Sequence, residues 1–179
     1  MKLQTLVPTP EAKENRVKYL TITGIMATLI TLMTAYICHI PVGTNGGYVH
    51  FGDALIYLGA AILPRPYAFA AAAIGGGLAD LLTAPMWIPA TVIIKMLIVL
   101  PFTSHSSRLI TVRNVVAAIL AYGISGVGYF VAEYILFETI SVFWISMIHN
   151  LVQSGGSAIF FIVFGMALDK ANFKMRFMN

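Results

Sequence analysis

Ionisable and amide side chains interrupt the long apolar stretches of this sequence, and their types could do chemistry. They are Asp53, Asp80, Lys95, Glu133, His149, Asn150 and Gln153. The last three are spaced so that they share one face of a helix. Such groups are costly in hydrocarbon, so they usually pair with one another or serve a function. Opposite charges here could form an ion pair, and the amides and imidazole could bind a polar ligand.

The composition indicates that lipid is part of the solvent of this chain. Its 179 residues are 59% hydrophobic and only 10% charged, whereas soluble domains have about 25% charged residues. A soluble fold of this size could not bury so much apolar surface. We therefore expect residues 1–179 to form a single integral membrane domain of the all-α class.

Six apolar stretches are candidates for multi-pass transmembrane helices, since a helix needs about 20 residues to cross a bilayer core. We expect an uncleaved first span, because its apolar run is longer than that of a signal peptide. The weakest boundary separates the fifth span from the sixth. The predicted spans are about 19–40, 49–63, 67–84, 88–104, 114–137 and 141–168.

The basic residues predict an orientation with both termini in the cytoplasm. With six spans, ten of the 11 basic residues lie on the side of the termini. The three loops on the other side, about 41–48, 85–88 and 138–140, contain none. Cytoplasmic loops of membrane proteins are enriched in Lys and Arg. The eleventh basic residue, Lys95, lies within a span.

At about 1.5 Å per residue, the polar groups of spans two to six lie at similar depths, displaced toward the outer face. Two interpretations remain open. Lys95 could pair with Asp80 or Asp53 to neutralise buried charge, or the groups could line a pocket open to the outside. Trp87, Trp144 and Tyr48 would lie at its rim, as interface aromatics or as a lid stacked on a flat ligand. The glycine-rich loop 41–48 could be a gate or an ordinary turn.

Small residues form two further patterns. The third span contains Gly75, Gly76 and Gly77, which suit close helix packing or make space for a ligand. The first span has a ridge of small residues that suits internal packing or the docking of another membrane helix. Its members are Gly24, Ala27, Thr28 and Thr31.

Motifs of familiar enzymes and metal sites are missing from the sequence. It has no phosphate-binding G-x-x-x-x-G-K-[ST] and no H-E-x-x-H, and its single cysteine, Cys38, excludes Cys-based metal sites. The Ser154–Ser157 segment has no nucleophile-elbow context. We expect no cofactor, no metal and no nucleic acid, and any energy must come from an ion gradient or a partner chain.

Three segments together resemble a family signature. They are GYVHFGDALIYL at 47–58, IGGGLADLL at 74–82 and WIPATVIIK at 87–95. Their order is similar to that in S components of energy-coupling factor (ECF) transporters, and most similar to the hydroxymethylpyrimidine/pyridoxine-type branch.

The resemblance implies a six-helix subunit that binds a vitamin near the outer surface and is no enzyme. It implies docking, through small residues of the first span, on a transmembrane coupling (T) subunit with two cytoplasmic ATPases, as an ECF-type ABC importer. Pyridoxine or hydroxymethylpyrimidine is the expected substrate; riboflavin, queuosine precursors and thiamine-related compounds remain open. The expected substrate-binding residues are Tyr48, Asp53, Asp80, Trp87, Lys95, His149, Asn150 and Gln153.

Three other functions stay open on the residues alone. A stand-alone ion-coupled carrier would use Asp53, Asp80 and Glu133 as relays, and an intramembrane enzyme would depend on His149. A structural membrane subunit would need no ligand. Co-purification with two ATPases would separate an S component from all three.

Overall fold

The computed structural model describes residues 10–37, 40–41, 48–138 and 143–177, with side chains for residues 14–37, 50–138 and 147–176. Its elements are α1 (Pro10–Leu32), η1 (Met33–Ile37), β1 (Ile40–Pro41), β2 (Tyr48–Val49), α2 (Gly52–Ile62), α3 (Arg65–Thr83), η2 (Pro85–Trp87), α4 (Ile88–Val99), α5 (Val112–Phe137), α6 (Phe143–Lys170) and α7 (Phe173–Phe177). The expected all-α class is confirmed, because the only strands of the described chain have two residues each.

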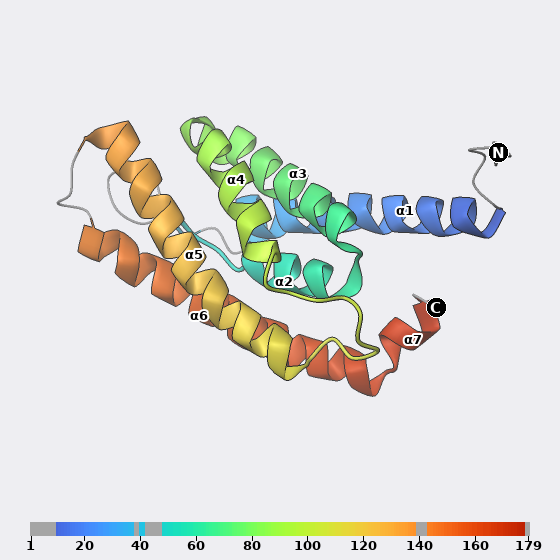
Figure 1. Cartoon of the computed structure of the whole chain (residues 1–179). Helices are drawn as coiled ribbons and strands as arrows, with labels where there is room; N and C mark the ends of the chain where they lie inside the picture. The colour runs from blue at the N-terminus through green and yellow to red at the C-terminus, as the bar shows by residue number, and fades with distance from the viewer. Residues whose placement is uncertain (1–9, 38–39, 42–47, 139–142, 178–179) are drawn as a thin grey trace, which may run out of the picture.

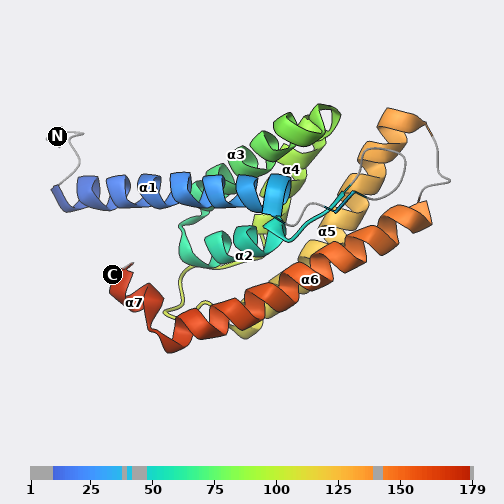
Figure 2. The same cartoon turned by 180° about the vertical axis from the view of Figure 1, so that it is seen from behind.

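The helices form a bundle with both described chain ends at the same end of the molecule (Figure 1). Helices that are close in the sequence pack against each other: α1 packs on α3, α3 on α4, α4 on α5 and α5 on α6. The end of α5 and the start of α6 lie at the opposite end, as the view from behind also shows (Figure 2). This arrangement agrees with placing both termini on one side of a membrane, although which side they face stays a prediction.

The short helix α2 lies in the interior of the bundle. It contacts α1, α3 and α6, and ten of its 11 residues are buried. Its Tyr57 ring stacks on Phe102, with ring centroids 5.1 Å apart, and meets the edge of Phe161. Because α2 is enclosed, any polar residue on it is enclosed too, and Asp53 stands in its first turn.

The glycine run of α3 serves helix packing. A Cβ on Gly75 would lie 2.7 Å from the Cβ of Ile30 on α1, and one on Gly76 would lie 3.0 Å from the Cγ of Lys95 on α4. Thr31 also donates a hydrogen bond across the α1–α3 contact to the carbonyl of Gly75, at 3.1 Å. The geometry therefore supports the packing interpretation of this run.

Each predicted span overlaps one of the helices α1 to α6, but the bounds and lengths differ. Within the part of the chain that the structure describes, three helical segments are long and apolar enough to cross a membrane, namely Glu14–Ile37, Val112–Phe137 and Met147–Lys170. The predicted second and fourth spans are longer than α2 and α4, which have 11 and 12 residues, or about 16–18 Å. Loop segments at their ends account for the difference. The count of six spans stays a prediction.

Two other predicted boundaries have clear outcomes. The first helix starts earlier than the predicted first span, because α1 begins at Pro10 rather than near residue 19. The break between the fifth and sixth helices is confirmed, since α5 ends at Phe137 and Glu138 adopts a left-handed conformation with φ 51°. The proposed gate at residues 42–47 lies outside the described residues.

The segment between α4 and α5 is held by two polar side chains. Asp169 on α6 accepts hydrogen bonds from the backbone N–H groups of Leu109, at 2.7 Å, and Ile110, at 3.0 Å. The buried amide of Asn114 bonds the N–H and the carbonyl of Thr103 and the carbonyl of Leu109. These bonds fix residues 103–110 against the end of the bundle where the termini lie.

Candidate functional site

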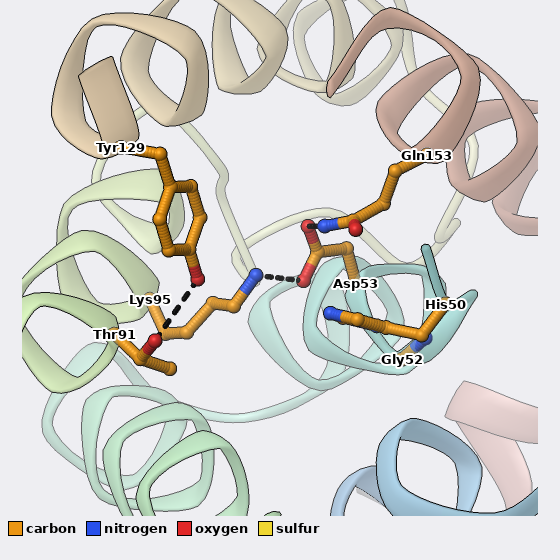
Figure 3. A network of polar contacts seen from close by, with 7 residues as sticks. All are labelled: His50, Gly52, Asp53, Thr91, Lys95, Tyr129 and Gln153. Atoms are coloured by element: carbon orange, nitrogen blue, oxygen red, sulfur yellow. Dashed lines mark hydrogen bonds and ion pairs between the residues drawn. The ribbon is translucent and has the colours of Figure 1, made fainter. Parts of the chain in front are cut away.

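A buried ion pair joins α2 to α4 in the interior. The Nζ of Lys95 donates to the Oδ1 of Asp53 at 2.5 Å, and their side chains are 2% and 0% exposed. Figure 3 shows the two side chains extended toward each other. Of the two partners expected for Lys95, Asp53 therefore forms the direct contact, while Asp80, also buried, lies close enough to interact electrostatically.

The second oxygen of Asp53 faces α6. Gln153 donates from Nε2 to Oδ2 of Asp53 at 3.3 Å, so the carboxylate is shared between α4 and α6 (Figure 3). His50 precedes α2, and its Nδ1 accepts a hydrogen bond from the N–H of Gly52 at 3.0 Å. The start of α2 also favours a negative charge there through its helix dipole.

Tyr129 and Thr91, which were not among the expected site residues, lie next to Lys95 (Figure 3). Its Nζ lies 5.4 Å from the ring centroid of Tyr129 on α5, which is within the range of a cation–π contact. The hydroxyl of Tyr129 lies 3.1 Å from that of Thr91, and Figure 3 shows both beside the stem of Lys95. Thr91 stands four residues before Lys95, a spacing that could have placed it on the same helix face.

The buried hydroxyls of Tyr57 and Ser154 interact with each other, although they form no hydrogen bond of regular geometry. Tyr57 is one helical turn beyond Asp53 and lies within its electrostatic reach, and Ser154 follows Gln153 on α6. Buried polar groups are normally hydrogen-bonded, and here each of the two hydroxyls has the other as a polar neighbour.

The other expected site residues are distributed around this centre. Asn150 is buried and donates to the backbone carbonyl of Tyr122, at 3.0 Å, so one of its amide hydrogens joins α6 to α5. Trp87 is buried rather than at a rim, and its ring packs near Tyr129 and Phe137. His149 is half-buried.

Two expected aromatic residues cannot be placed by their side chains. The backbone of Tyr48 lies in β2, where it pairs with Pro41, and its side chain lies outside the described residues. The same is true of the side chain of Trp144 on α6. No group of three or more metal-ligating side chains occurs among the residues that the structure describes.

The arrangement is a neutralised, enclosed polar centre formed by α2, α4, α5 and α6. It offers a carboxylate, an ammonium, an amide and several hydroxyls within apolar walls. Sites for small polar ligands have this composition, because a few placed polar groups fix the orientation of a ligand that the walls desolvate.

Residues 14–170 match the family model of the ECF-type riboflavin transporter, S component. The chain belongs to this family. No curated protein sequence matches it significantly. The protein is therefore a membrane protein of vitamin uptake, a transporter component rather than an enzyme.

The small-residue ridge of this S component divides into two faces. Ala27 and Thr31 are buried against α3, so the structure does not leave them free for docking as expected. Gly24 and Thr28 are exposed, and a Cβ on Gly24 would meet nothing within 4 Å. The exposed half of the ridge is the part that another helix can reach.

We predict that Lys95→Met strongly destabilises the protein, because it leaves the buried Asp53 carboxylate without its counter-charge. The free energy of unfolding should fall by about 3–5 kcal/mol. This corresponds to a decrease of roughly 10 °C in the midpoint of thermal unfolding in detergent. The double variant Asp53→Asn with Lys95→Met should recover most of that loss. Lys18→Met, which removes a charge from the accessible end of α1, is the control. A single variant as stable as the control would contradict the role of the pair.

Proposed function

We propose that this S component captures a vitamin from outside the cell and delivers it by docking on a T subunit with two ATPases. The family assignment supports the capture role. ATP hydrolysis by partner chains is consistent with the absence of a phosphate-binding motif from the sequence. In this proposal the chain lies in a bacterial plasma membrane as a six-span protein with both termini in the cytoplasm.

The observation that best supports a ligand site is the enclosed polar centre around Asp53. Four helices contribute to it, and its carboxylate is contacted from two of them. The hydroxyl of Tyr57 lies within electrostatic reach of this carboxylate, so the centre offers a ligand a further polar group. We therefore place the ligand against this centre.

The proposed ligand is a flat, hydroxylated nitrogen heterocycle. The imide edge of a flavin offers alternating acceptors and a donor, which match the ammonium of Lys95, the amide of Gln153 and the carboxylate of Asp53. The description of the matched family makes riboflavin the first candidate.

Pyridoxine and hydroxymethylpyrimidine are the second candidates. The order of the three sequence segments resembles their branch, and each molecule has a ring nitrogen and a hydroxymethyl group that the same side chains could bind. Their smaller rings would need fewer contacts. The sequence segments that favour them include Asp53, Asp80 and Lys95.

The proposed substrate-binding residues differ in the contacts that they make in this structure. Asp53, Lys95 and Gln153 contact one another at the centre, and Asp80, Trp87 and His149 lie farther from the direct bond. Asn150 already donates one amide hydrogen to the backbone of α5, so it would bind a ligand through its second amide hydrogen or its carbonyl oxygen. Tyr48 is kept as a proposed covering residue.

We predict that the purified protein binds at least one of riboflavin, pyridoxine and hydroxymethylpyrimidine with a Kd below about 1 μM. Gln153→Ala should weaken that binding about tenfold or more, which corresponds to about 1.4 kcal/mol, because it removes a donor at the centre. Calorimetric titration measures both effects. Thr21→Ala, on the exposed part of α1, is the control.

The ligand proposal fails if none of the three compounds binds below that concentration while the protein remains folded. It also fails if Gln153→Ala, Asn150→Ala and Lys95→Ala all bind as the parent does. Uptake by vesicles that contain only this chain would instead favour an ion-coupled carrier.

We further predict that Gly24→Trp prevents docking on the T subunit without affecting vitamin binding. The large ring would occupy the exposed face where a partner helix is expected to approach Gly24 and Thr28. Gly123→Trp on α5 is the matched control, because a Cβ there also meets nothing within 4 Å. Co-purification with the T subunit and ATPases measures docking, and equal recovery of both variants would contradict the proposed face.

A further inference from the structure

A second candidate site, an open pocket, lies at the end of the bundle where the termini lie (Figure 1). It is a pocket of about 500 Å³, bounded by the end of α2, the start of α3, the segment after α4, and α7. Small-molecule sites have volumes of about 300–1,000 Å³. The pocket shares no lining residue with the polar centre around Asp53.

The charged residues that line this pocket are all positive. Arg65, His105, Arg113 and Lys174 line it, and none of its described lining residues is acidic. The structure gives Arg65, Arg113 and Lys174 no ion pair with a described residue. Three basic side chains thus line one concave surface.

Lys174 is fixed at the wall of the pocket. It is 8% exposed, and its Nζ donates to the carbonyls of Ala61, at 2.8 Å, and Ser104, at 2.6 Å. An ammonium has three donors, so one remains for a ligand. Burial lowers the pKa of Lys174, an effect that the nearby Asp169 partly opposes, and a bound anion would favour its charged form.

The carboxylate of Asp169, which is near Lys174, adds no negative charge to the lining of the pocket. Its two oxygens accept the backbone N–H groups of Leu109 and Ile110, and Asp169 is not a lining residue. Arg113 uses its Nε toward the carbonyl of Pro101, at 3.3 Å, which leaves the donors at the end of its guanidinium. The guanidinium of Arg65 is exposed.

We propose that this pocket binds a phosphate group, presented by the headgroup of an anionic lipid or by a soluble phosphate. Arginine donors match phosphate oxygens bidentately, and basic pockets between helices at the cytoplasmic surface suit anionic headgroups. Tyr19 lines the pocket and packs against Tyr67, with ring centroids 5.3 Å apart, and tyrosines are enriched at the interface where headgroups lie. The proposal is independent of the identity of the vitamin.

The test compares thermal unfolding of the full chain in nanodiscs of phosphatidylcholine with and without phosphatidylglycerol. We expect the anionic lipid to raise the unfolding midpoint of the parent by several degrees. The double variant Arg65→Gln with Arg113→Gln should lose at least half of that shift. The matched control is Arg16→Gln with Arg108→Gln, which removes the same charge from exposed residues that do not line the pocket, and it should keep the shift.

A second arm distinguishes the source of the phosphate. Inorganic phosphate is titrated into nanodiscs of phosphatidylcholine alone, with chloride at equal ionic strength as a reference. A saturable increase that depends on Arg65 and Arg113 supports the site with a soluble ligand, whereas an effect of phosphatidylglycerol alone supports the site with a lipid. Equal losses in both double variants, or no shift with either phosphate source, would overturn the proposal.

Vitamin affinity separates this site from the proposed function. The Arg65→Gln, Arg113→Gln variant should bind the vitamin as the parent does, because neither residue lies at the polar centre. A loss of phosphate-dependent stabilisation with vitamin binding retained is the expected pattern. Loss of both together would show that the substitutions act on the fold and would overturn the assignment of a separate site.

Discussion

The contact between Asp53 and Lys95 is the constraint on which the rest of this structure depends. Two full charges in an apolar interior are stable only when they meet, and they meet only if the start of α2 lies against the middle of α4. The small residue Gly76 lets the stem of Lys95 pass close to α3. Burial of nearly the whole of α2 then places the carboxylate at the centre of the bundle.

The same interaction relates stability to binding. A carboxylate contacted by Lys95 and Gln153 is satisfied without a ligand, so the empty protein can be stable. The hydroxyls of Tyr57 and Ser154 interact with each other. A ligand at this centre would exchange bonds with the ion pair, which suits a subunit that must later release its vitamin.

The sequence predicted the helical class and an ion pair for Lys95, since apolar runs and isolated charges are local signals. It could not choose between Asp53 and Asp80 as the partner of Lys95, because helix rotation and depth decide that contact. Tyr129 was missed because a tyrosine in an apolar run resembles a packing residue. Ala27 was expected to be available for docking, but a ridge of small residues does not itself show which face α3 covers. The match to the S-component family confirms the coarse function, while the vitamin stays a proposal.

The most direct measurement is the vitamin affinity of the double variant Asp53→Asn with Lys95→Met, purified in folded form. This variant removes both charges and leaves no unpaired ion, so a change in affinity reports on ligand contacts rather than on unfolding. If the polar centre binds the vitamin, affinity should fall at least a hundredfold, or about 2.7 kcal/mol. Affinity equal to that of the parent would contradict the site and leave the pair with a structural role alone.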